Sequence, residues 1–73
     1  MIDYNTEIKK IFREVEPSEY RDDMFFEIVR EWEEEHGEVN GMKLYAFIKK
    51  NERVPESVEE LENWTGAMYF NSK

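Results

Sequence analysis

The side chains in this sequence that could do chemistry are mostly carboxylates. The 73 residues include 18 acidic and ten basic side chains, a formal net charge of −8, one histidine and no cysteine. Without cysteine the chain can form neither a disulfide nor a thiolate metal site. Ser18 and Ser57 stand where helices are expected to begin, and Ser72 stands next to the last residue, so none suggests a nucleophile activated by a base. We therefore expect no catalytic residue and a protein that is not an enzyme.

The single histidine, His36, follows Glu33 at the Glu-x-x-His spacing that di-iron helical bundles use. Such a site needs two of these motifs and two further glutamates, and one histidine cannot supply them. A histidine in the last turn of a helix interacts favourably with the helix dipole, and that is our interpretation of His36. Because no calcium-loop, phosphate-loop or zinc-ligand spacing occurs either, we predict no metal and no cofactor.

The acids are concentrated in the N-terminal half. Residues 1–36 hold twelve acids and five bases, whereas residues 37–73 hold six acids and five bases. Four of them recur at i, i+4, i+8 and i+11, which would place them along one side of a helix; we call them the acidic stripe: Asp23, Glu27, Glu31 and Glu34. Like charges at this spacing repel by about 0.2–0.5 kcal/mol per pair. A surface shaped by stability alone would more often intersperse lysines, so the stripe is a candidate surface for a basic partner.

Aromatic side chains would complete such a surface, because aromatic anchors carry much of the energy of protein interfaces. Phe26 lies on the polar flank of its expected helix, although neighbouring helices could also enclose it. Tyr69 and Phe70 belong to a short apolar tail, residues 67–73, which either packs on the domain or contacts a partner. We therefore predict that partner binding involves the acidic stripe together with Phe26, Tyr69 and Phe70.

Four segments show apolar residues at helical spacing, each bounded by proline, glycine or a capping residue. They predict helices at residues 3–15, 18–36, 41–52 and 57–65. Asp3 or Asn5 could cap the first helix, and Pro17 suits the first turn of the second. No run alternates as a strand would, so we expect a single-domain, all-α bundle of about four short helices over residues 1–73. The expected core comprises Phe25, Ile28, Trp32, Leu44, Ile48 and Leu61.

Composition also suggests a location. The first residues show neither the basic nor the apolar region of a signal peptide. The longest apolar run, residues 44–48, is far too short to span a membrane. Together with the absence of cysteine, this predicts a cytoplasmic protein that does not contact membranes.

A chain of this charge favours a basic protein surface and repels nucleic acid at long range. We therefore expect a regulator or inhibitor of a protein with a basic surface. In size and charge the chain resembles small acidic inhibitors of phages and mobile elements, which imitate rows of phosphates. One alternative is a nucleic-acid-binding module that uses the cations of the third helix: Lys43, Lys49, Lys50 and Arg53. A second alternative is a self-associating structural protein, a homodimer in which the third helix of one copy meets the second helix of another.

Overall fold

The computed structural model describes residues 3–66. It contains four α-helices: α1 (Tyr4–Glu14), α2 (Glu19–His36), α3 (Gly41–Asn51) and α4 (Val58–Asn63). No strand occurs in this part of the chain, so the prediction of a small all-α bundle is confirmed. None of these helices combines the length and apolar composition that a membrane crossing requires.

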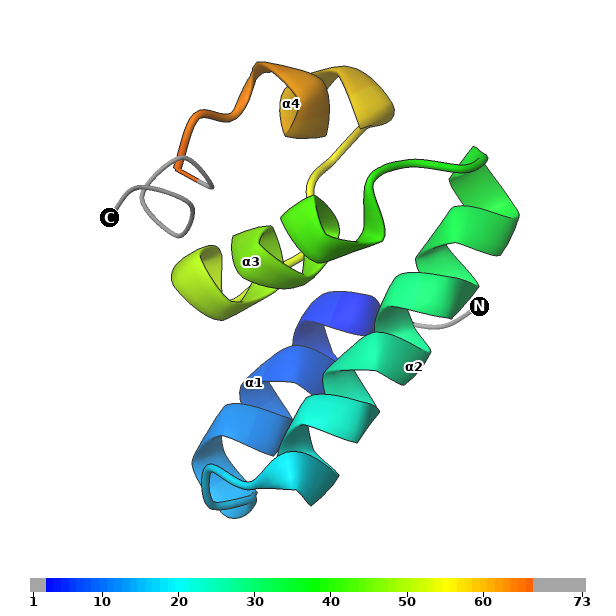
Figure 1. Cartoon of the computed structure of the whole chain (residues 1–73). Helices are drawn as coiled ribbons and strands as arrows, with labels where there is room; N and C mark the ends of the chain where they lie inside the picture. The colour runs from blue at the N-terminus through cyan, green and yellow to red at the C-terminus, as the bar shows by residue number, and fades with distance from the viewer. Residues whose placement is uncertain (1–2, 67–73) are drawn as a thin grey trace.

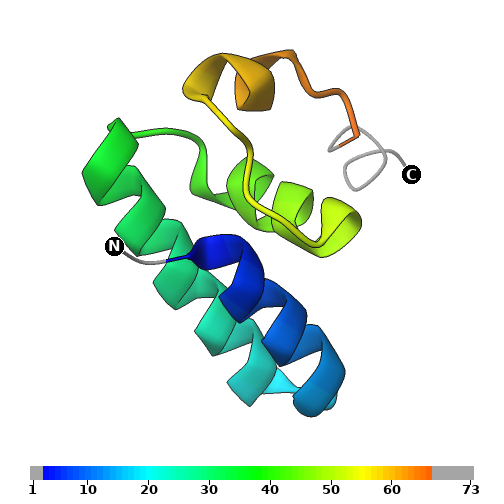
Figure 2. The ribbon, with the colours of Figure 1, turned by 180° about the vertical axis from the view of Figure 1, so that it is seen from behind.

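The helices are arranged as a pair with a second layer across it. α1 and α2 lie side by side and antiparallel, α3 crosses them, and α4 packs on α3 (Figure 1). Seen from behind, the segment that links α3 to α4 passes the start of α1 (Figure 2). There the side chain of Asn5 accepts a hydrogen bond from the backbone N–H of Val54 at 2.9 Å. This bond ties the first helix to the link between the last two.

Each helix begins at a side chain that accepts a backbone hydrogen bond, as N-capping residues do. Asp3 caps α1, Ser18 caps α2, and the remaining caps are Asn40 and Ser57. The expectation that Pro17 occupies the first turn of α2 is wrong, because Ser18 is the cap and the proline precedes it. A serine hydroxyl satisfies a free N–H of the first turn, which proline could not do.

The helix ends show one larger departure from the prediction. α2 ends at His36 and is capped by Gly37, whose φ of 102° is easily adopted by glycine alone. α4 ends at Asn63 instead of residue 65, because Trp64 leaves the helix with extended dihedral angles. Its ring then packs edge-on against Phe47, with 5.0 Å between ring centroids. The early end of α4 thus coincides with the packing of this half-buried ring on α3.

The core lies where the faces of all four helices meet. All six residues expected in the core are buried, so that prediction is confirmed. α1 adds Tyr4, Ile8 and Ile11 to the same cluster, and the other buried members are Val29 and Phe47. Aromatic rings dominate it, with Trp32, Phe25 and Phe47 the largest fully buried side chains. Each such ring removes about 150–250 Å² from water, which compensates for the small size of the chain.

Candidate protein-binding surface

The structure brings the four residues of the acidic stripe to one side of α2. With 3.6 residues per turn they lie within an arc of about 80°. Asp23, Glu27 and Glu34 are exposed, and Glu31 is half-buried. Glu27 forms an ion pair with Arg30 at 2.8 Å. Within residues 3–66 no cation pairs with the other three carboxylates, so most of the charge of the stripe is unbalanced.

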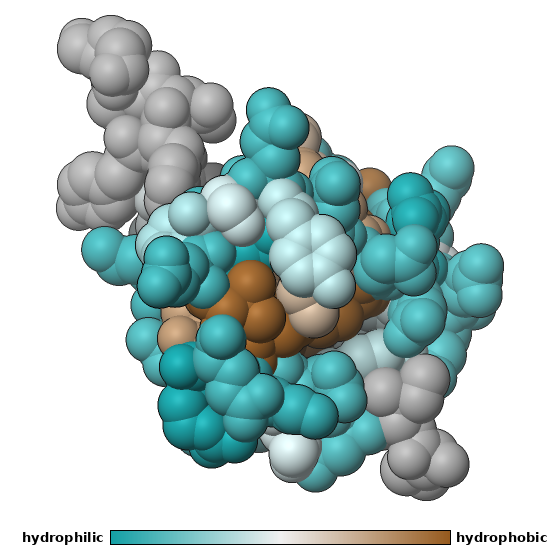
Figure 3. Space-filling model, turned by 90° about the horizontal axis from the view of Figure 1, so that it is seen from below, coloured by the Kyte–Doolittle hydropathy of each residue, from teal (hydrophilic) through white to brown (hydrophobic). Residues whose placement is uncertain are grey.

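Part of the stripe borders a groove of about 380 Å³ between α1 and α2. Its lining comes from Tyr4, Glu7 and Ile11 of α1 and from Met24, Glu27, Ile28 and Glu31 of α2. Ile11 and Ile28 are buried and Met24 is half-buried, so the floor is apolar while the margins carry carboxylates. From below, where α1 and α2 face the viewer, apolar surface crosses the molecule between hydrophilic side chains (Figure 3).

Tyr4 lies at the α2 C-terminal end of this groove, close to further carboxylates. The residue is 8% exposed, and its hydroxyl has no partner in hydrogen-bonding geometry among the described residues. Burial, and then the nearby carboxylate of Glu35, raise the pKa of Tyr4 to about 12, and Glu31 and Glu34 add smaller effects. The shift follows because a phenolate here would be poorly solvated and surrounded by like charge. This end of the groove therefore combines a buried phenol with nearby carboxylates.

Phe26 lies on the opposite flank of α2, away from the groove. Its ring is half-buried and stacks on Tyr45 of α3, with 4.4 Å between centroids and 10° between planes. The Tyr45 hydroxyl donates to the Asp22 carboxylate at 2.8 Å, and Lys49 stands over the Tyr45 ring. Phe26 thus contributes to the contact between α2 and α3, and its role as a partner anchor stays a prediction.

The four cations of the alternative nucleic-acid surface are not gathered on one face. Lys43 donates from Nζ to the carbonyl of Glu62 in α4 at 3.0 Å. Lys49 points the other way, 3.8 Å from the carboxylate of Asp22 in α2. Lys50 is exposed. Because two of these cations turn to opposite neighbours of α3, they do not form a continuous track for phosphates.

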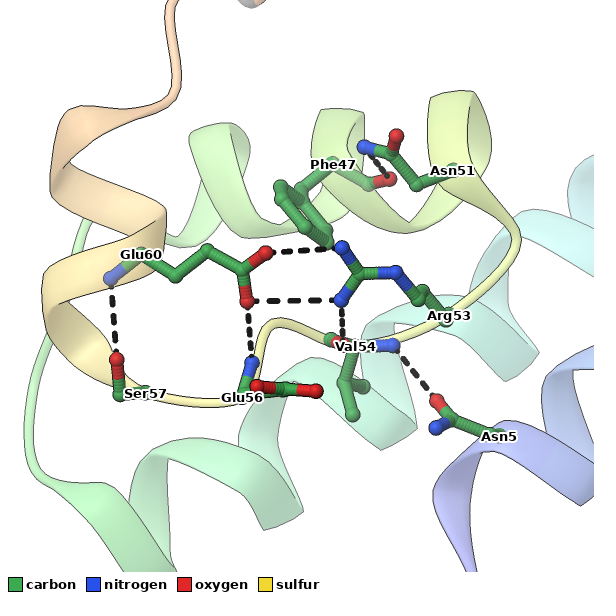
Figure 4. Close-up of polar contacts among 8 residues, drawn as sticks. All are labelled: Asn5, Phe47, Asn51, Arg53, Val54, Glu56, Ser57 and Glu60. Carbon is green, nitrogen blue, oxygen red and sulfur yellow. Dashed lines mark hydrogen bonds and ion pairs between the residues drawn. The ribbon is translucent and has the colours of Figure 1, made fainter.

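The fourth cation, Arg53, belongs to a network that joins α3 to α4 (Figure 4). Its guanidinium donates to the Glu60 carboxylate at 2.8 Å and to the Val54 carbonyl at 3.0 Å, and it lies over the Phe47 ring. The same carboxylate accepts the backbone N–H of Glu56 at 2.6 Å. The Arg53 bond, and then the Glu56 bond, lower the pKa of Glu60. We conclude that Arg53 is held in place by structural contacts.

This network also differs from the usual capping box, in which the acidic residue three positions after the cap bonds back to the backbone N–H of the cap itself. The hydroxyl of Ser57 accepts the N–H of Glu60 at 3.1 Å, as in that motif. The Glu60 carboxylate, however, returns to the backbone of Glu56, one residue before the cap. Arg53 pulls the carboxylate to that side, so a distant partner changes a local motif.

His36 occupies the last turn of α2, where the sequence places it. Its ring stacks on Trp32 with 4.0 Å between centroids, and Nδ1 lies 3.0 Å from the Trp32 carbonyl oxygen. With the proton on Nδ1, the ring donates to that carbonyl in the last turns of the helix. Among residues 3–66 no cluster of three potential ligands could hold a metal ion.

Two predicted partner residues, Tyr69 and Phe70, lie outside the described residues. In the other direction, sequence reasoning missed the contributions of Tyr4 and Glu7 to the groove. Tyr4, Glu7 and Ile11 stand at i, i+3 and i+7, which is the spacing that places residues on one face of a helix. Tyr4 escaped notice because it stands in the first turn of α1, and Glu7 because a lone carboxylate is usually solvated.

No protein family, curated protein or solved structure matches this chain, so its own geometry carries the functional argument.

Proposed function

We propose that this chain is a non-catalytic binding protein that regulates or inhibits a protein with a basic surface. The observation that carries the proposal is the acidic stripe on one side of α2, whose charge is mostly unbalanced by the described residues. Carboxylates aligned in this way attract a cationic partner and speed its diffusional encounter. They also discourage binding to acidic surfaces and to nucleic acid.

Charge alone does not make a stable complex, because exposed ion pairs contribute only about 0–1 kcal/mol each. The groove beside the stripe supplies what charge lacks, since Met24, Ile11 and Ile28 offer apolar surface next to the carboxylates. An apolar centre with a charged margin is the usual composition of a protein interface. The stripe and groove together therefore support a protein partner better than a small ion.

The two alternatives have weaker support. Lys43, Lys49 and Arg53 make intramolecular contacts, which leaves less free positive charge for phosphates or for the α2 of a second copy. Light scattering at several concentrations distinguishes self-association, and salt-dependent DNA binding distinguishes a nucleic-acid module. The proposed site of action is the cytoplasm, on the basis of a composition without cysteine.

The proposal is tested by capturing the partner from the cells that make this protein, with identification by mass spectrometry. One bait is the unchanged chain, and the second carries Glu27→Lys and Glu31→Lys. The control bait carries Glu59→Lys and Glu62→Lys, two exposed α4 positions with the same change of charge. We expect a basic protein that the unchanged and control baits retain and the stripe variant loses. Equal retention by all three baits would contradict a role for the stripe.

A further inference from the structure

We infer that the groove between α1 and α2 receives one face of a basic amphipathic helix from the partner. This inference rests on the proposed function and specifies the chemistry that the partner must present. It concerns the groove, whereas the proposed function concerns the stripe as a whole. The two claims can therefore fail separately.

The shape of the groove suits side chains that project from successive turns of a helix. Its lining residues extend from Tyr4 to Ile11 on α1 and from Met24 to Glu31 on α2, which is about 10 Å along each axis. The volume of about 380 Å³ is enough for a few side chains and too small for a whole helix. Helices that bind in grooves present such side chains at i, i+3, i+4 and i+7.

The chemistry of the groove selects the type of helix. Its floor is formed by Ile11, Ile28 and Met24, and its margins by carboxylates of both helices. Of these, Glu7 and Glu31 have no cationic partner within residues 3–66. Lysine and arginine match both features, because their aliphatic stems cover apolar surface while their charged ends reach carboxylates. A leucine-rich or methionine-rich helix flanked by lysine or arginine is therefore the complementary partner.

Among residues 3–66, the lining of the groove comes from α1 and α2 alone. On the other flank of α2, Asp22 and Phe26 contact Tyr45 of α3. Neither α3 nor α4 contributes to the lining of the groove. A helix bound there would add a third element beside α1 and α2 without displacing the existing core.

The direct test uses the full chain and a synthetic 18-residue peptide of leucine and lysine, with leucine at i, i+3, i+4 and i+7. A control peptide has the same composition in an order that destroys the apolar face. We expect the amphipathic peptide to bind one to one, at least about tenfold tighter than the control peptide. In methyl NMR spectra of the unchanged protein, we expect the largest shifts at Ile11, Met24 and Ile28. This measurement needs no variant that could fail to fold.

Two matched pairs of variants then separate the groove from the general charge. Met24→Ser removes apolar floor, and Met42→Ser makes the same change at an exposed position on α3. We expect about tenfold weaker binding for the first, since the apolar contact of one methionine is lost, and no change for the second. Glu31→Lys, at the margin of the groove, should weaken binding more than Glu34→Lys, which belongs to the stripe alone.

The inference is overturned if both peptides bind equally, or if Met24→Ser and Met42→Ser behave alike. In that case the stripe acts through charge only, and the proposed function stands. Binding of neither peptide also overturns the inference, while the capture experiment decides the proposed function independently. Melting curves for each variant confirm that any loss of binding occurs in a folded protein.

Discussion

Among single residues, Tyr4 has a polar group, its hydroxyl, in an unfavourable environment. Its phenol is buried against Glu35 and lacks a hydrogen-bond partner in good geometry among the described residues. A buried polar group without a partner costs about 1–3 kcal/mol relative to a paired one. The ring of Tyr4 also lines one end of the groove, so the apolar part of this side chain contributes to the groove although its hydroxyl lacks a partner among the described residues.

Tyr4→Phe tests this interpretation of the hydroxyl. The pKa of Tyr4 is about 12 in the fold, against an ordinary value of 10.0. Between these values the unfolded chain loses its proton while the folded chain keeps it, so stability is present below pH 10 and declines as the pH rises to about 12. In urea unfolding at pH 7 the Tyr4→Phe variant should be no less stable than the unchanged chain, and at pH 11 it should have lost less stability. Destabilisation by about 1 kcal/mol at pH 7 would instead mean that the hydroxyl donates to Glu35.

Tyr45→Phe is the matched control, because this tyrosine has the partner that Tyr4 lacks. Its hydroxyl donates to Asp22 at 2.8 Å. Removing that bond should cost about 0.5–1.5 kcal/mol at neutral pH. Although the two substitutions are chemically identical, their effects on the free energy of unfolding should therefore differ in sign or size.

The backbone of Glu52 is strained by a positive φ. It ends α3 with φ 58° and ψ 33°, the left-handed conformation that glycine adopts without steric cost. Its negative charge also stands at a helix C-terminus, where the dipole is unfavourable to anions. We expect Glu52→Gly to stabilise the fold by about 0.5–1 kcal/mol in urea unfolding. Glu52→Ala removes the charge but keeps the strain, so an equal gain from alanine would assign the effect to charge alone.

At the scale of elements, α4 depends most on its connections. It has six residues, too few to be stable as an isolated helix. The Ser57 cap, the Arg53–Glu60 ion pair and the packing of Trp64 on Phe47 hold it against α3. We therefore expect α4 to be the first helix to open when these contacts are weakened.

Acid should weaken one of the contacts that hold α4, the Arg53–Glu60 ion pair. The pKa of Glu60 is lowered from its ordinary value of 4.5, so its contribution to stability is present above pH 4.5 and is lost as the pH falls through the folded value. Glu60→Gln should make stability depend less on pH in that range. Urea unfolding at pH 6 and pH 3 measures this, with Glu59→Gln as the control on the same helix. Parallel curves for Glu60→Gln and the unchanged chain would show that the ion pair contributes nothing.

The same elements show which parts of a fold can be predicted from sequence. Caps and apolar spacing are local, so helix starts at Asp3, Ser18 and Ser57 follow from neighbouring residues. The end of α4 depends on Phe47, seventeen positions before Trp64, and no local pattern contains that contact. The return of Glu60 to Glu56 likewise depends on Arg53. Prediction failed where a distant side chain changed a local preference.

For the whole molecule, the central feature is a polarised charge distribution beside an apolar groove. The acidic stripe was predictable, because four residues on one helix obey one period. The groove was not, since it exists only when Tyr4 and Glu7 of α1 meet Met24 and Glu31 of α2. Sequence analysis assigned Ile28 to the core, which is correct but does not predict that the groove beside it is open to solvent.

Recruitment of a basic partner by the acidic stripe is tested most directly by the association rate of the captured partner with the chain that carries Glu27→Lys and Glu31→Lys. Electrostatic steering acts on the on-rate and is screened by salt. At low salt we predict association at least about tenfold slower than for the unchanged chain. At high salt the two rates should converge, and the melting temperature should be unchanged or slightly higher because like charges are removed from one helix side. An unchanged on-rate at low salt, in a folded variant, would contradict the claim that this acidic surface recruits a basic partner.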